Sequence, residues 1–263
     1  MGLTPPNVAS REAKAAVFKA LALDEADWEA HCVLAAILTW TDWNWSAAER
    51  EWKRLIELDP NNTAFLPGYS HFLMHMGRHA EAMAVIERAL KLDPFSVWNQ
   101  SFYAVDLLYA RRYDDAVSAA RAALRLQPDA PVAGNALYEA LLMTGRLDEA
   151  LALDKEKFAG DRELAEALEQ GESQAGYVGA QRRLAQVLTA RSGKQGGGTA
   201  LGLAHRWMYA GDKDRALDWL DKAYETHDPN MPYLGKPIYD PLRSDPRFQA
   251  LLRKMNLPVD GKK

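Results

Sequence analysis

Apolar and polar residues alternate along the chain with a period close to that of an α-helix. In one clear stretch, Ala82, Ile86 and Ala89 fall on one helical face. Glu81 and Arg88 fall on another face of the same stretch. Similar stretches recur along most of the chain, separated by short segments that contain Gly, Pro or Asp. The pattern predicts helices joined by short turns.

The helical pattern repeats with a fixed period. Pro60, Pro94 and Pro128 are 34 residues apart, and the first two follow a Leu-Asp pair. Proline disfavours helical geometry in the residue before it, so each of these positions should end a helix. Gly77 can supply the turn before the second helix of a unit. Small residues allow two antiparallel helices to approach closely, and they recur in register at Ala82, Ala116 and Ala150.

This 34-residue unit resembles the tetratricopeptide repeat (TPR), a helix–turn–helix motif. We expect copies at 28–62, 63–96, 97–130 and 131–164. The second copy carries the signature residues Leu66, Tyr69, Leu73, Gly77, Ala82, Ile86, Ala89 and Pro94. The resemblance implies an all-α fold, a right-handed α-solenoid of helix–turn–helix repeats.

The remaining segments are predicted around this array. Residues 1–27 should form a lead-in helix, and 165–196 a degenerate repeat followed by a Gly-rich connector. A further repeat is expected at 197–230, with Leu203, Ala204, Trp207, Gly211, Ala216, Leu220 and Ala223 at the repeat positions. Residues 231–263 should form a C-terminal cap, because the last repeat would otherwise expose its apolar side.

Four strings of residues have a narrower resemblance. Residues 42–49, 92–96, 109–116 and 240–248 are similar to the C-terminal repeat regions of bacterial signalling proteins. In those proteins the array follows a winged-helix DNA-binding, adenylate-cyclase or protein-kinase domain. Only about 27 residues precede the first repeat here, so no effector domain is expected in this chain. The resemblance implies a role in signalling or regulation without a catalytic or DNA-binding activity of its own.

Composition narrows the class of protein further. The net charge is −4, which argues against a general nucleic-acid binder. The single cysteine, Cys32, excludes an internal disulfide and a multi-cysteine zinc site. No run approaches the roughly 18 apolar residues of a membrane helix, and the N-terminus lacks an export signal. We therefore expect a cytoplasmic protein, or a periplasmic one if the array is tethered in a longer chain.

The TPR resemblance also implies a concave groove lined by the first helix of each repeat. Carried over position by position, the partner-binding residues are Trp40, His71, Met74, His75, Trp98, Phe102, Tyr109, Asn135, Glu139 and Met143. This aromatic, methionine-rich surface suits a peptide or protein segment with apolar side chains. Packing between helices is the alternative for Phe102, Leu108 and Leu142, whereas Trp98 and Tyr109 are expected in the groove.

Other patterns are weaker. His71 and His75 have the i, i+4 spacing of a metal-binding pair, but no further ligand is evident, so a metal- or ligand-sensing role is only an alternative. The connector from Gly193 to Gly198 differs from a phosphate-binding loop because Lys194 precedes the glycines. No arrangement demands catalysis, and we expect neither an enzyme nor a cofactor. A homo-oligomeric scaffold is the other alternative.

Overall fold

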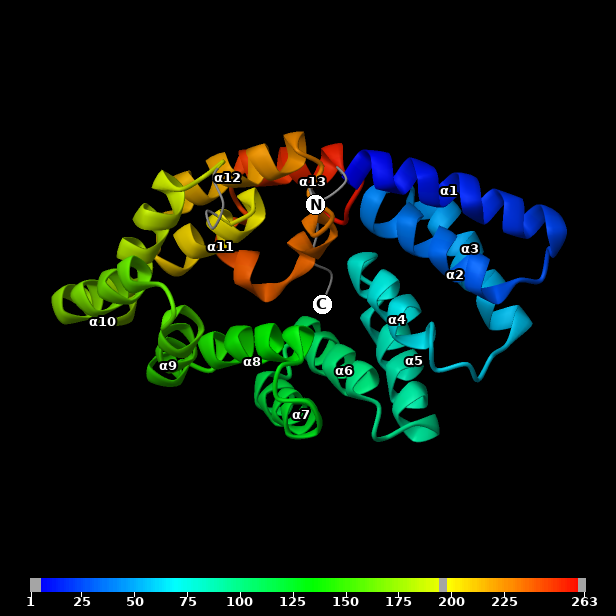
Figure 1. Cartoon of the computed structure of the whole chain (residues 1–263), viewed down its shortest axis with the longest axis horizontal. Coiled ribbons are helices and arrows are strands. Elements are labelled where there is room, and N and C mark those ends of the chain that lie inside the picture. Colours follow the sequence, from blue (N-terminus) through cyan, green and yellow to red (C-terminus); the bar gives the residue numbers. More distant parts are fainter. Residues whose placement is uncertain (1–5, 194–197, 260–263) are drawn as a thin grey trace.

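The computed structural model describes residues 6–193 and 198–259. Within these residues every regular element is helical, and successive helices run as paired units around a curve (Figure 1). The prediction of an all-α solenoid of helical repeats is confirmed. Lys194 and most of the Gly-rich connector lie outside the described residues.

The elements follow one another in a simple order. Helix α1 (Pro6–Leu23) precedes α2 (Trp28–Ala36), a π-helical turn η1 (Ile37–Thr41) and α3 (Trp45–Leu58). The central helices are α4 (Leu66–His75), α5 (His79–Leu92), α6 (Val97–Tyr109), α7 (Tyr113–Leu126), α8 (Pro131–Met143) and α9 (Leu147–Phe158). The rest are α10 (Arg162–Ala190), α11 (Ala200–Tyr209), α12 (Lys213–Glu225), the 3₁₀ turns η2 (Met231–Gly235) and η3 (Pro237–Leu242), and α13 (Pro246–Lys254).

The turns within helix pairs use left-handed backbone. Gly77, Gly145 and Gly211 follow α4, α8 and α11 with φ of 71°, 73° and 75°. Glycine is the usual residue there because it has no Cβ to clash. Arg111 holds the same place after α6 with φ of 61°, a conformation that costs a non-glycine residue some energy. These turns reverse the chain so that each pair packs antiparallel.

Helix α10 is a hairpin of two helices. The backbone leaves helical geometry at Ala175 and at Gly176, which has φ of 58°. The two halves cross at Gly171 and Gly179, where a Cβ on Gly171 would lie 2.3 Å from the carbonyl oxygen of Gly179. Only glycines permit this approach. A degenerate repeat is expected from residue 165 onward, and α10 supplies two helices in this region.

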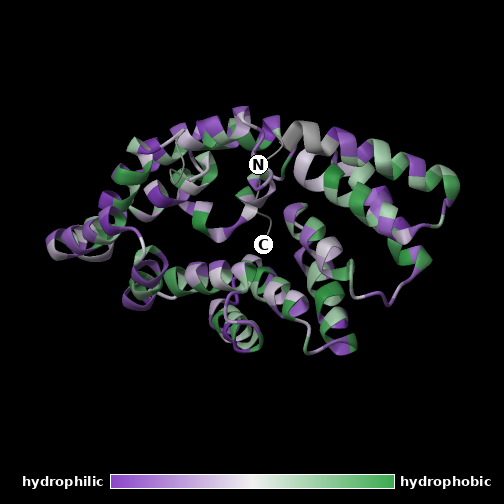
Figure 2. Ribbon diagram, in the orientation of Figure 1, coloured by the Kyte–Doolittle hydropathy of each residue, from purple (hydrophilic) through white to green (hydrophobic). Residues whose placement is uncertain are grey.

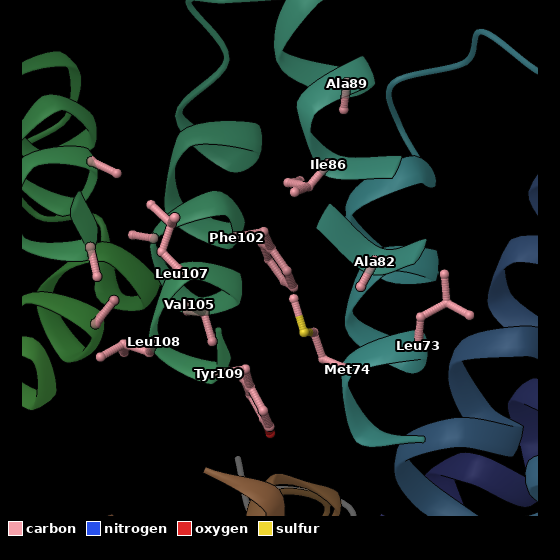
Figure 3. Close-up of a cluster of buried hydrophobic side chains, with 14 of the residues drawn as sticks. Leu73, Met74, Ala82, Ile86, Ala89, Phe102, Val105, Leu107, Leu108 and Tyr109 are labelled. Carbon is pink, nitrogen blue, oxygen red and sulfur yellow. The ribbon is translucent and has the colours of Figure 1, made fainter. Parts of the chain in front are cut away.

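Two hydrophobic clusters carry most of the core. One extends through α2–α9, and Figure 3 shows its centre, where Phe102 of α6 points toward Met74 of α4. The other joins α11 and α12 to η2, η3 and α13, and it buries Phe248, Leu251 and Met255. Hydrophobic and hydrophilic residues alternate along each helix, as amphipathic packing requires (Figure 2).

The C-terminal segment turns into the interior of the curve. We call residues 231–242, which form η2 and η3, the strap. The strap lies on the inner side of the array in Figure 1, where η2 packs against α4 and η1, and η3 packs against α8. The C-terminal region therefore does more than cover the last repeat, which was its expected role.

Overpacking a helix contact should destabilise the array. Ala82 is fully buried in α5, so Ala82→Leu should lower the free energy of unfolding by about 1–3 kcal/mol. Ala84, on the exposed face of the same helix, is the matched control, and Ala84→Leu should change stability by less than about 0.5 kcal/mol. Urea denaturation measures both. Equal effects of the two substitutions would contradict this packing.

Candidate functional site

The candidate site is the inner face of the array, formed by the side chains that α4, α6 and α8 direct toward the strap. The Tyr233 ring packs against both predicted histidines, with centroids 5.2 Å from His71 and 4.7 Å from His75. Gly235 approaches Tyr109 so closely that a Cβ would sit 3.1 Å from the ring. Figure 3 shows Tyr109 pointing toward this segment. The strap therefore covers the ends of α4 and α6 with aromatic contacts.

A buried ion pair joins the strap to α8. The ammonium of Lys236 lies 2.9 Å from Oε1 of Glu139, and both residues are less than 10% exposed. The same ammonium lies 5.0 Å from the centre of the Tyr233 ring. Burying two charges is costly, and the cost is repaid only while both partners are present. Each charge thus makes the other necessary.

The inner face also holds a buried His–Asp contact. Nδ1 of His71 lies 3.1 Å from Oδ1 of Asp106, and both side chains are inaccessible to solvent. Burial lowers the pKa of His71 to about 3, assisted by the nearby positive charge of Lys236. Burial also raises the pKa of the Asp106 carboxyl well above its ordinary value. Both shifts favour the neutral forms of the two side chains.

His75 is similarly enclosed. The Tyr109 hydroxyl lies 3.3 Å from Nδ1 of His75, and burial lowers the pKa of this histidine well below its ordinary value. Nδ1 of each histidine thus contacts a side chain of α6. Over the described ranges 6–193 and 198–259, no three His, Cys, Asp or Glu side chains converge as a metal site requires.

Burial divides the ten predicted partner-binding residues. Trp98 is 51% exposed and Asn135 is exposed, whereas Trp40 and Met143 are partly buried. The remaining six are buried: His71, Met74, His75, Phe102, Tyr109 and Glu139. The expectation of an exposed groove is wrong at these six positions. The strap covers His71, His75, Tyr109 and Glu139, while Met74 and Phe102 pack between helices.

The two ends of the array meet beside the strap. Trp43 stacks on His227 with ring centroids 3.7 Å apart, and Nε2 of His227 lies 2.6 Å from the carbonyl oxygen of Thr41. The indole of Trp45 donates to the carbonyl oxygen of Met255 at 2.6 Å. Arg111 and Asp240 add an ion pair at the rim. Together with the strap contacts, these interactions form what we call the seam.

A second buried polar cluster escaped the sequence analysis. Asp154 accepts hydrogen bonds from Arg206 at 2.8 Å, from Gln181 at 2.7 Å and from Tyr138 at 2.6 Å. It occupies a position of α9 where the repeat expects an apolar residue. That interruption was the available signal, but its partner Arg206 lies 52 residues later. The cluster ties α8, α9, α10 and α11 together.

The fold and its inner face define a helical-repeat protein of the solenoid class. The tetratricopeptide repeat model matches residues 43–97 and 104–162, which confirms the predicted repeats in these two segments. No curated protein gives a significant match. Among the described residues, no helix combines the length and hydrophobicity needed to cross a bilayer.

Solved structures with the same fold are distant in sequence. The chain aligns with PilW, described as a widely conserved type IV pilus biogenesis factor, with TM-score 0.52 and 19% identity over 92% of this chain and 90% of that one. It aligns with the APC/C hetero-tetramer Cut9–Hcn1 with TM-score 0.53 and 15% identity, over 94% of this chain and 52% of that chain. These similarities show a common fold.

Removing one partner of the ion pair between Lys236 and Glu139 should lower the free energy of unfolding. Lys236→Met leaves the Glu139 carboxylate buried without a partner, so unfolding should become easier by about 3–5 kcal/mol. The double variant Lys236→Met with Glu139→Leu should recover most of that loss, because an apolar pair removes both charges. Chemical denaturation compares the three proteins. A single variant as stable as the wild type would show that the pair is unimportant.

Buried histidines should make stability depend on pH. The pKa of His75 is lowered from 6.5, so below pH 6.5 the unfolded chain takes up a proton that the folded chain excludes. Its contribution is complete above pH 6.5 and is lost as the pH falls. His75→Phe should reduce the slope of unfolding free energy between pH 6 and 5 by up to about 1.4 kcal/mol per pH unit. An unchanged slope would contradict the burial of His75.

Proposed function

We propose that the protein is an interaction module that binds a partner's peptide segment along the inner face, starting at Trp98. The observation that carries this proposal is the half-exposed Trp98 ring, which packs 4.4 Å from the buried Phe102 ring. Aromatic residues with one face supported and the other open are typical anchors of protein interfaces. The strap leaves this end of α6 uncovered.

Other exposed side chains of the same repeat and the two adjacent ones support an interface of mixed character. Phe95, in the turn just before α6, is 78% exposed, and Leu126 at the end of α7 is 46% exposed. Asn135, which is exposed on α8, offers amide donors and acceptors. Large exposed apolar side chains of this kind are typical of surfaces that a partner covers.

The narrower resemblance supports a place in bacterial signalling or regulation. Trp43, Trp45 and Asp240 belong to two of the four strings that carry it, and all three make seam contacts. Part of the resemblance thus rests on residues that hold the two ends of this chain together. We infer that regulated binding, rather than an activity of its own, is the role of the array.

A homo-oligomeric scaffold is the second candidate, because a second copy could also cover Trp98 and Phe95. Light scattering over a dilution series separates the two candidates: a tight dimer that Trp98→Ala dissociates favours the scaffold. No contact favours metal sensing at His71 and His75, because both rings are buried and both Nδ1 atoms face protein groups.

The groove proposal is tested by substituting its anchor. Trp98→Ala should reduce partner capture from a lysate of the native host at least tenfold, since an interface anchor contributes about 2 kcal/mol or more. Thermal unfolding should change little, because half of the side chain is already exposed. Quantitative mass spectrometry of captured proteins measures the effect.

The matched control is Phe18→Ala on α1, where an aromatic ring of similar exposure lies outside the inner face. This variant should retain the captured proteins. The proposal fails if both variants capture the same proteins in equal amounts, or if Trp98→Ala unfolds the chain.

A further inference from the structure

The strap itself shows which side chains the inner face accepts. Tyr233 packs its ring against His71 and His75, and Lys236 pairs with Glu139. We propose that the inner face is a recognition site for partner segments bearing an aromatic residue and, three residues later, a lysine, and that the strap is its intramolecular ligand. This inference rests on the proposed function and specifies the partner's chemistry.

Charge complementarity selects the lysine. Glu139 is 6% exposed, and Lys236 is the cation that its carboxylate meets, at 2.9 Å. A buried carboxylate strongly favours an occupant that brings a positive charge to the same point. A partner segment that displaces the strap therefore has to supply a cation near Glu139.

Unpaired polar atoms distinguish the seam from an ordinary core. Nε2 of His75, Oδ2 of Asp106 and Nε1 of Trp43 are buried without a hydrogen-bond partner in the described part of the chain. Native cores leave few such atoms, and here three of them lie on the face that meets the strap or beside it. The seam thus retains donors and an acceptor that the strap does not use, and a partner segment with further polar groups can engage them.

The exposed end of the inner face continues into the covered part. Trp98 packs on Phe102, whose ring lies 4.6 Å from His71, and His71 in turn packs on Tyr233. This series of rings leads from solvent to the strap without interruption. Two rings, those of Phe102 and His71, thus separate a segment anchored at Trp98 from the position that Tyr233 occupies.

The strap belongs structurally to the C-terminal part of the chain. Met231, Leu234 and Tyr239 are fully buried in the cluster with α11 and α12. Tyr233 and Lys236 are the strap side chains that reach across to α4 and α8. Separating the seam thus exposes the recognition site and leaves the contacts inside each main cluster in place.

The test uses the full chain and a labelled peptide with the sequence of residues 231–242. Wild-type protein should bind it weakly, because the attached strap competes at a high effective concentration. The variant Tyr233→Ala with Lys236→Ala should bind at least tenfold more tightly. Adding Glu139→Gln should reverse that gain, whereas Glu149→Gln, at an exposed glutamate of α9, should not. Fluorescence anisotropy measures binding, and circular dichroism confirms folding.

Hydrogen exchange on the wild-type chain tests the same point without substitution. Strap amides should exchange at least tenfold faster than those of α4 and α6, and excess peptide should accelerate them further. The inference is overturned if the double variant is folded and does not bind the peptide. It is also overturned if the strap amides exchange only at the rate of global unfolding. If the double variant self-associates and the peptide cannot dissociate the oligomer, the inference is overturned, and the occupant of the inner face is a second copy of the chain.

The two proposals can fail separately. Loss of peptide binding while Trp98-dependent capture persists contradicts the recognition rule alone. Peptide binding at the strap site without any Trp98-dependent partner contradicts the proposed function alone.

Discussion

The close approach of paired helices at alanine is the constraint on which the structure depends. Ala82, Ala116, Ala150 and Ala216 are all fully buried at equivalent positions of their repeats. A methyl group lets neighbouring helices pack at short distance, and repeated packing of the same kind turns each pair slightly relative to the last. The accumulated rotation curves the array until its two ends meet.

That curvature gives the inner face its particular chemistry. The strap is held from one side by an apolar cluster, and it meets the other side through aromatic contacts with His71 and His75 and through a buried ion pair. Apolar burial keeps the strap folded with α11 and α12, whereas the polar contacts specify how it sits on α4 and α8. The uncovered aromatic end at Trp98 is what remains of the face for a partner.

Helix positions and turn glycines were predictable because they depend on neighbouring residues. The 34-residue period placed the paired helices, and Gly77, Gly145 and Gly211 adopt the left-handed backbone that the turn requires. Trp98 is 51% exposed, whereas Tyr109, which was also expected in an open groove, is 4% exposed. The TPR resemblance implied the face on which Tyr109 lies, and it carried no information about what covers that face.

The sequence by itself determined the helices, their pairing and the side of each helix that faces inward, because these follow from contacts within a repeat or between adjacent ones. Only the tertiary structure decided the occupant of the inner face. The contacts that place it join residues far apart, from Glu139 and Lys236, separated by 97 positions, to Trp45 and Met255, separated by 210. Such pairs produce no repeating pattern in the sequence, because each pair occurs once. Their contact depends on the summed curvature of all the repeats between them.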